Sequence, residues 1–227
     1  MRVAPPGPVF QAGGPRDDLC PPRSSEAGDA RPDRRIYGAP MPEVPKGWLR
    51  EAKRIDLALY AAIAATPTPV LDRGMTTVSR AADHSRLWLS AAAILAISRG
   101  PSGRRAAGAG LASVAATSAL VNAVLKPIGG RRRPDPEQVP LARQIRMPRS
   151  TSFPSGHAAS AFAFATSIGR VLPREAVALQ AFAAVVAYSR VHTGVHYPAD
   201  VVTGSLIGVA VAQLTGHRLE RRFTRRA

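Results

Sequence analysis

Cysteine is almost absent from the sequence: Cys20 is the single one among 227 residues. One cysteine cannot form an intrachain disulfide, a thiolate metal cluster or a Cys-x-x-Cys redox site. Aromatic residues make up only 5% of the chain, and proteins that bind single-stranded nucleic acid stack the bases on exposed aromatic rings. We therefore expect neither cysteine chemistry nor a nucleic-acid partner.

Acidic residues are scarce beside basic ones, with 15 Asp and Glu against 31 Lys and Arg and a net charge of +16. With nucleic acid disfavoured, such an excess suits an anionic membrane surface or a negatively charged substrate. No acidic cluster of the kind that holds magnesium accompanies the basic motifs described below. We expect a site that binds anions through its own cations, with no metal ion or other cofactor.

Large apolar residues are few in the first 45 residues, which are rich in proline and carry scattered charges. Such a segment cannot bury enough surface to offset the entropy of ordering, so we predict a disordered tail over 1–45. It also lacks the apolar h-region of a secretory signal. A membrane-embedded domain over 46–217 and a basic cytoplasmic tail over 218–227 complete the predicted organisation.

Long hydrophobic runs are rare as well. From Trp48 onward, six charge-free runs alternate with arginine-bearing connectors: 57–71, 87–98, 106–125, 150–169, 176–189 and 201–216. Only 106–125 and 150–169 reach the roughly 20 residues that a spanning helix needs. Flanking arginines can extend a short span, and the small residues of these runs are typical of close helix packing in membranes. We predict an all-α, six-helix transmembrane bundle, with a soluble helical bundle as the alternative because mean hydropathy is only -0.05.

Six spans would place both termini on one side of the membrane. The arginines of both tails and of the connector 99–105 also lie on that side. The positive-inside rule then puts the termini in the cytoplasm and the loops 126–150 and 190–200 outside. We expect a multi-pass protein of the cell membrane whose active site faces the extracytoplasmic side.

Basic and hydroxyl side chains concentrate in three stretches at the ends of apolar runs: Lys126-Pro-Ile-Gly-Gly-Arg-Arg-Arg133-Pro134, Pro154-Ser155-Gly156-His157 and Ser189-Arg190-Val-His-Thr-Gly-Val-His196-Tyr-Pro-Ala-Asp200. The pattern Lys-x6-Arg-Pro, Pro-Ser-Gly-His and Ser-Arg-x5-His-x3-Asp resembles the type 2 phosphatidic acid phosphatase superfamily. That superfamily also contains vanadium haloperoxidases and bacterial class A acid phosphatases. The resemblance covers about residues 50–216 and rests on three motifs in order on one predicted membrane face.

Three cations are candidate phosphate ligands: Lys126, Arg133 and Arg190. Pro127 and the pair Gly129-Gly130 are expected to end the preceding helix, so that Lys126 and Arg133 lie on a turn and can converge. Lysine offers a compact charge, whereas a guanidinium presents a planar fork to two phosphate oxygens. The remaining arginines of this loop are interpreted as headgroup anchors outside the site: Arg131, Arg132, Arg143, Arg146 and Arg149.

Ser155, Gly156 and His157 precede an apolar run, which predicts that they form the first turn of a helix. The free N–H groups and positive dipole end of such a turn favour an anion. The resemblance implies that Ser155 and Gly156 contact the phosphoryl oxygens and that His157 is the general acid. A histidine that merely caps the helix is the alternative for His157.

His196 is followed four positions later by Asp200, a spacing that brings the carboxylate onto the same side. A carboxylate that binds one imidazole nitrogen fixes the tautomer and leaves the other nitrogen free to attack. The resemblance implies the same roles, with His196 as the nucleophile that forms a transient phosphohistidine. His192 occupies an unconstrained position of the motif and is interpreted as a bystander.

The resemblance implies a membrane lipid phosphate phosphatase whose partners are its lipid substrate and membrane lipids. Amphiphilic candidates are polyprenyl pyrophosphate, phosphatidic acid, phosphatidylglycerol phosphate and a polyprenyl-phosphoryl sugar phosphate. The Ala- and Arg-rich chain is similar to small actinobacterial members, in which a decaprenyl-phosphoryl phosphoribose phosphatase of cell-wall synthesis is a candidate. The alternatives are a vanadate-dependent haloperoxidase and a non-enzymatic protein that binds anionic lipid.

Overall fold

The computed structural model describes residues 47–224, except for the side chains of His84 and of residues 217–224. The chain divides into two units, Met1–Val44 and Pro45–Ala227, and all the described residues belong to the second. The predicted disordered tail over 1–45 therefore lies outside the described residues. At the other end, helix α8 continues through Thr224.

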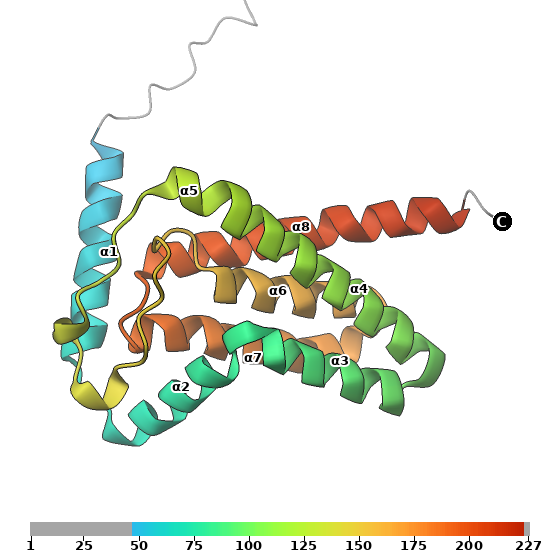
Figure 1. Ribbon diagram of the computed structural model, residues 1–227, viewed down its shortest axis with the longest axis horizontal. Helices are drawn as coiled ribbons and strands as arrows, with labels where there is room; N and C mark the ends of the chain where they lie inside the picture. The colour runs from blue at the N-terminus through green and yellow to red at the C-terminus, as the bar shows by residue number, and fades with distance from the viewer. Residues whose placement is uncertain (1–46, 225–227) are drawn as a thin grey trace, which may run out of the picture. The chain divides into compact units, whose positions relative to one another are not determined.

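The described residues form helices and connecting loops without any strand, which confirms the all-α prediction (Figure 1). Three 3-10 turns and one π-helical segment, Leu120–Leu125, interrupt the α-helices. The 3-10 turns are Asp83–Ser85, Pro136–Gln138 and Leu141–Arg143. The α-helices are α1 Trp48–Ala65, α2 Pro69–Ala81, α3 Arg86–Ser98, α4 Gly100–Ala119, α5 Lys126–Gly129, α6 Gly156–Gly169, α7 Pro173–His192 and α8 Pro198–Thr224.

Two of the predicted spans differ from the structure. The run 57–71 is not one helix, because α1 ends at Ala65 and α2 begins at Pro69. Thr66 precedes a proline, which disfavours helical backbone, and it adopts an extended ψ of 116°. The run 150–169 is helical only from Gly156 onward. The charge-free runs therefore do not coincide with the helices, and counting the runs does not give the number of membrane spans.

Two helical stretches among the described residues are long and apolar enough to cross a membrane: Gly100–Gly129 and Pro198–Gly216. Six spans are thus not confirmed. Large apolar side chains are nevertheless exposed along several helices, as on α3 and α7, where Ile97 is 85% and Val177 72% exposed. Such a surface is costly in water and suits lipid.

Helix α6 occupies the centre of the bundle and packs against α4, α7 and α8 (Figure 1). Most of its apolar side chains are buried, with Phe164 and Ile168 completely covered and Phe162 partly exposed. Phe164 lies beside Trp88 of α3, with ring centroids 5.4 Å apart. The N-terminus of this central helix points into the loops 130–155 and 193–197.

Helix α8 approaches α6 backbone to backbone through Gly204 and Gly208. A Cβ on Gly204 would lie 2.4 Å from the carbonyl oxygen of Ser155, and one on Gly208 would lie 2.1 Å from that of Ala159. Glycines four residues apart allow this contact, as in membrane helix pairs. Because Asp200 lies one turn before Gly204, the contact places its carboxylate beside the first turn of α6.

Candidate active site

The three basic motifs meet at one end of the bundle. The loop 130–155 crosses the N-termini of α6 and α8 and the C-terminus of α7 (Figure 1). Backbone bonds join the segments: Ser155 N donates to Asp200 O at 2.9 Å, and His196 N donates to Arg190 O at 3.2 Å. The fold therefore brings together residues that lie far apart in the chain, with His157 bonded to Asp83 across 74 positions and Arg190 bonded to Ser79 across 111.

The first turn of α6 has the predicted form. Ser155 is the N-cap, and its side chain accepts from the backbone N–H of Ala158 at 3.5 Å. Gly156 and His157 are then the first two helical residues. Their backbone N–H groups have no helical partner in the preceding residues, which is the arrangement that attracts an anion to a helix N-terminus.

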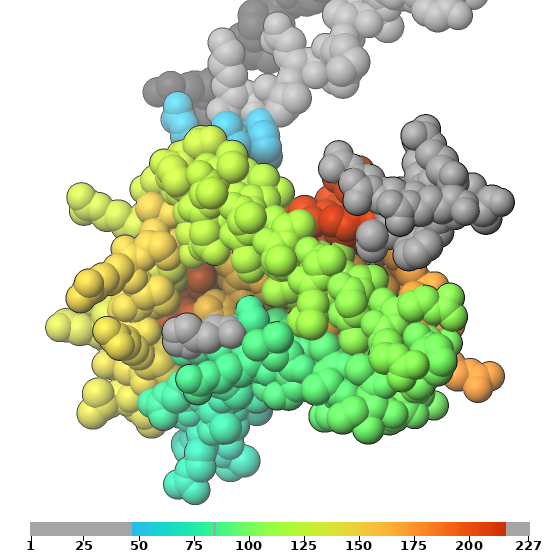
Figure 2. All heavy atoms as spheres, turned by 45° about the vertical axis from the view of Figure 1, so that its right-hand side comes forward, coloured from blue at the N-terminus to red at the C-terminus, as the bar shows by residue number. Residues whose placement is uncertain are grey.

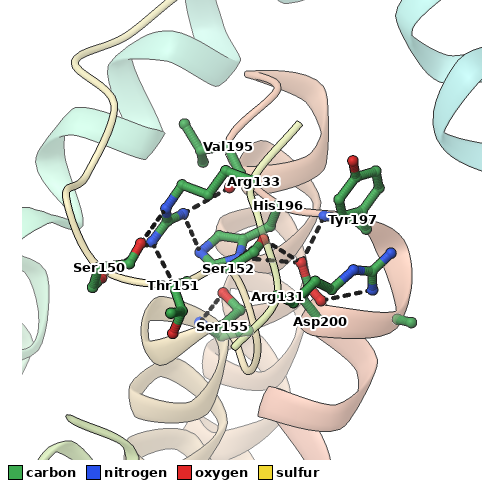
Figure 3. A network of polar contacts seen from close by, with 12 residues as sticks. Arg131, Arg133, Ser150, Thr151, Ser152, Ser155, Val195, His196, Tyr197 and Asp200 are labelled. Atoms are coloured by element: carbon green, nitrogen blue, oxygen red, sulfur yellow. Dashed lines mark hydrogen bonds and ion pairs between the residues drawn. The ribbon is translucent and has the colours of Figure 1, made fainter. Parts of the chain in front are cut away.

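His196 is completely buried between a carboxylate and a guanidinium (Figure 3). Its Nδ1 lies 3.6 Å from Asp200 Oδ2, longer than a hydrogen bond, and 3.4 Å from Ser152 Oγ. Ser152 Oγ donates its one proton to Asp200 Oδ2 at 2.5 Å, so it can only accept from Nδ1. Arg133 Nη1 lies 3.2 Å from Nε2 and can only donate. Both contacts indicate the same tautomer, with the proton on Nδ1 and the lone pair on Nε2.

Burial lowers the pKa of His196 to about 3. The positive charges of Arg133 and Arg190 contribute to this lowering of the pKa, whereas the nearby carboxylate of Asp200 opposes it. The imidazole is consequently neutral at pH 7, as a nucleophile must be. Its neutral form is the stable form in the folded protein.

Arg133 holds several parts of the loop at the nucleophile. Its guanidinium donates to the carbonyls of Val195 at 2.7 Å, Ser150 at 2.8 Å and Thr151 at 3.1 Å. Lys126 Nζ donates to Ser150 Oγ at 3.0 Å, and Arg133 Nη2 lies 3.3 Å from the same oxygen. The predicted convergence of Lys126 and Arg133 therefore occurs, at the hydroxyl group of Ser150.

The route by which Lys126 reaches the site differs from the prediction. Lys126 does not lie on a turn but begins the short helix α5, and the helix ends at Gly130, which has φ 53°. The π-helical segment Leu120–Leu125 directly precedes Lys126. Pro127 is tolerated because the first turn of a helix needs no N–H donor from it. The wider π turn shifts the register of the residues that follow and leaves Lys126 Nζ 3.9 Å from a Cβ position on Gly156.

His157 and Arg190 share one carboxylate. Asp83 Oδ1 lies 2.9 Å from His157 Nε2 and 3.8 Å from Arg190 Nη1. Arg190 is buried and also donates to the hydroxyl of Ser79 at 2.6 Å. Asp83 belongs to none of the sequence motifs, and no pattern in the sequence singles it out.

Two arginines interpreted as headgroup anchors are internal, which corrects that prediction. Arg143 is completely buried and donates to Asp72 Oδ1 at 2.7 Å and to the carbonyl of Ile63 at 3.0 Å. Arg131 donates to Asp200 and Asp56. Loop arginines serve as internal ligands here because the loop folds over carboxylates that a linear sequence does not reveal. The exposed Arg132, Arg146 and Arg149 keep the anchor interpretation.

His192 lies apart from the nucleophile. Its side chain is buried, and Nε2 lies 3.0 Å from Asp72 Oδ1, the carboxylate that Arg143 also binds. This cluster joins α2, α7 and the turn Leu141–Arg143. The position agrees with the interpretation of His192 as a bystander to the chemistry.

A cavity of about 160 Å³ opens beside His157. Figure 2 shows the hollow between the yellow-green α4–α5 surface and the blue-green end of α2 and start of α3. Its walls come from the end of α2, the turn Asp83–Ser85, α3, α4, the π segment, α5 and α6. Seven of the lining side chains carry polar groups: Ser85, Trp88, Ser118, Asn122, Lys126, His157 and Ser160. Among the described residues no group of three or more His, Cys, Asp or Glu side chains is arranged to hold a metal ion.

Convergent cations, a helix N-terminus and a buried histidine beside a carboxylate form a site whose chemistry suits a phosphate ester. The family model of the PAP2 superfamily matches residues 107–223. The decaprenylphosphoryl-5-phosphoribose phosphatase of Mycolicibacterium smegmatis is 33% identical over 167 residues, covering 72% of this chain and 84% of that protein. The chain therefore belongs to the PAP2 superfamily.

Two solved structures share the fold. The crystal structure of Aquifex aeolicus LpxE is 25% identical with a TM-score of 0.60 and covers 71% of this chain and 94% of that one. The transmembrane PAP2-type phosphatidylglycerolphosphate phosphatase from Bacillus subtilis is 25% identical with a TM-score of 0.57, covering 75% and 87%. With these relatives, the protein is a lipid phosphate phosphatase of the membrane.

Proposed function

We propose that the protein hydrolyses its lipid phosphate through a phosphohistidine on His196. The observation that supports this proposal is the tautomer of His196, because two donor–acceptor contacts direct the lone pair of Nε2 toward the cations. When substrate binds, the N–H group that Arg133 directs at Nε2 donates to a phosphate oxygen instead. Substrate binding thereby frees the lone pair for attack.

In the first step, Nε2 of His196 attacks phosphorus in line with the leaving oxygen, and the P–O bond to the leaving group breaks. Lys126, Arg133, Arg190 and the first-turn amides of α6 hold the other phosphate oxygens as charge redistributes. His157 gives its proton to the leaving oxygen. In the second step, water attacks phosphorus, the P–N bond breaks, His157 takes the proton of the water, and inorganic phosphate leaves.

The phosphohistidine can be trapped. Brief incubation with a ³²P-labelled lipid phosphate followed by denaturation should leave label on the wild-type chain. The label should be stable in alkali and lost in acid, as expected of a phosphoramidate. Label should be missing from His196→Ala and present in His192→Gln, which keeps a donor to Asp72. Label in the His196→Ala chain would refute the proposal.

We further infer that the leaving group is hydroxylated, as in a polyprenyl-phosphoryl sugar phosphate. The cavity beside His157 is lined by three serine hydroxyls, the amide of Asn122 and the indole of Trp88, groups that suit a sugar ring. A relative named for a decaprenylphosphoryl-5-phosphoribose substrate supports the same class. Phosphate release should be compared across lipid-linked sugar phosphates, phosphatidic acid, phosphatidylglycerol phosphate and polyprenyl pyrophosphate in detergent. Preference for phosphatidic acid or polyprenyl pyrophosphate, whose leaving groups carry no additional hydroxyl, would overturn the inference.

The proposed setting is a multi-pass membrane domain with its active site on the extracytoplasmic face and its termini in the cytoplasm. The basic tails and the positive-inside rule support this orientation. Cys20, the single cysteine, is a natural reporter for the N-terminal side. A membrane-impermeant maleimide should label Cys20 only after lysis, and in a Cys20→Ser background Arg132→Cys should be labelled in intact cells. The reverse pattern would invert the orientation.

A further inference from the structure

The guanidinium of Arg131 lies between two buried carboxylates, Asp56 near the start of the domain and Asp200 near its end. Figure 3 shows its contact with Asp200. Its Nη1 donates to Asp200 Oδ1 at 2.9 Å, and its Nη2 donates to Asp56 Oδ2 of α1 at 2.5 Å. Its Cζ also lies 4.0 Å from the centre of the Tyr197 ring, so that the ring face supports the cation. One side chain thereby joins α1 to the start of α8.

The backbone of Arg131 fixes the other oxygen of Asp200. The carbonyl of Arg131 accepts from Ser152 N at 2.8 Å, and Ser152 Oγ donates to Asp200 Oδ2 at 2.5 Å. Asp200 Oδ2 also accepts from Tyr197 N at 3.0 Å. Arg131 therefore acts on Oδ1 directly and on Oδ2 through Ser152.

Asp56 of α1 binds both Arg131 and the first turn of α8. Its Oδ1 accepts from Ala199 N at 2.7 Å, in the first turn of α8, while its Oδ2 accepts from Arg131. Both carboxylates are buried, with exposures of 7% for Asp56 and 0% for Asp200. A buried carboxylate that loses its partner is strongly destabilised, so the three charges stay together.

We propose that Arg131 and Asp56 are positioning residues for Asp200 and, through it, for the nucleophile His196. The proposal rests on the phosphohistidine function proposed above. Asp200 Oδ2 is 3.6 Å from His196 Nδ1, so the tautomer depends on where Oδ2 and Ser152 are held rather than on one short bond. Neither Arg131 nor Asp56 needs to touch the substrate in this role.

The first experiment compares Arg131→Ala with Arg132→Ala in the full-length protein in detergent. Arg132 is the exposed neighbour on the same loop and is the matched control. Arg131→Ala should lower kcat by about 10- to 100-fold, the range typical of lost outer-shell partners, and leave KM within about twofold. Arg131→Lys should recover little activity, because one ammonium cannot bridge two carboxylates as a planar fork does. Asp56→Asn should also lower kcat while leaving KM nearly unchanged, but the fall in kcat should be smaller than in Arg131→Ala.

A double-mutant cycle separates positioning from general destabilisation. Arg131→Ala and Asp200→Asn are combined, and the rate of phosphoenzyme formation is measured by rapid quench. If Arg131 acts through Asp200, its removal should change the rate less than about threefold in the Asp200→Asn background. A purely structural role would lower the rate equally in both backgrounds, which overturns the proposal.

The remaining outcomes are also decisive. Unchanged kcat in Arg131→Ala overturns the proposal, as does a rise in KM with kcat preserved, because that result assigns Arg131 to substrate binding. If Arg131→Ala does not fold, Arg131→Lys and Asp56→Asn carry the same cycle with Asp200→Asn. A wild-type protein that forms no phosphohistidine refutes the proposed function, whereas a normal phosphohistidine in a fully active Arg131→Ala refutes only the positioning role.

Discussion

Two histidine–carboxylate pairs contribute to the proposed site, and their surroundings differ. His196 and Asp200 are buried, with exposed side-chain fractions of 2% and 0%. His157 and Asp83 are partly open, at 26% and 43%. The Asp200 carboxylate is fixed by Arg131, Ser152 and the backbone of Tyr197, whereas Asp83 lies on a short 3-10 turn between α2 and α3.

The contrast suits two different tasks. A nucleophile gains from a fixed tautomer and from exclusion of water, both of which burial provides. A general acid that must give up a proton and recover one in each turnover gains from contact with solvent. Each of the following predictions tests whether the pairs divide the work in this way.

The largest effect is expected at the nucleophile. His196→Ala should lower kcat by at least about 10⁴-fold, because no other group can form the covalent intermediate. Phosphate release from a lipid phosphate in detergent measures the loss. His192→Gln is the matched control on the adjoining segment and should keep activity within about fivefold. Comparable losses in the two variants would mean that the segment fails through misfolding.

His157→Ala should depend on the leaving group. With an alkyl lipid phosphate kcat should fall by about 10²- to 10⁴-fold, because the alkoxide then leaves without a proton. With p-nitrophenyl phosphate, whose leaving group needs no proton, phosphoenzyme formation should be nearly unchanged. Burst kinetics on both substrates provide the measurement. Equal losses on both would show that His157 binds phosphate rather than donating a proton.

Asp83→Asn should cost about tenfold with the alkyl substrate, as expected of a group that orients a catalytic histidine. The asparagine oxygen still accepts from His157 Nε2, so the ring stays in place. Asp200→Asn should cost much more, on the order of 10³- to 10⁴-fold, because an amide can impose the wrong tautomer on His196. Similar losses in the two variants would remove the asymmetry between the pairs.

The smallest effect concerns pH. Because the pKa of His196 is lowered to about 3, its imidazole stays neutral at all pH values well above that point. The rate of phosphoenzyme formation from p-nitrophenyl phosphate should thus vary less than about twofold between pH 8 and pH 5. If the nucleophile had an ordinary histidine pKa of about 6.5, the rate would fall over this range as the imidazole became protonated. A decline with a midpoint near pH 6.5 would contradict the buried setting.

The same lowered pKa has a consequence for stability. The folded protein resists protonation of His196, while the unfolded chain takes up the proton near pH 6.5. The contribution to stability is therefore complete above pH 6.5 and declines as pH falls toward about 3. Thermal unfolding in detergent across this range should show the decline, and His196→Gln should reduce it.

Local chemistry in the sequence was sufficient for the all-α class, the first turn of α6 and the convergence of Lys126 and Arg133. These features depend on helix capping and on motif spacing, which are properties of neighbouring residues. The break between α1 and α2 around Pro67 is explained by the proline but was not predicted, because the charge-free run 57–71 indicates one span. Charge counting alone does not locate helix ends.

Other features depend on contacts between distant segments. The sequence determined that the chain is basic, poor in cysteine and helical. It also determined that the cations, the histidines and the carboxylate occur in the motif order of this phosphatase superfamily. Only the tertiary structure decided that Arg131 is a ligand of Asp200, that Ser152 lies between Asp200 and His196, and that Asp83 faces His157. A motif records residues near one another in the chain, whereas the burial of charged groups depends on which side chains the packed helices bring within reach.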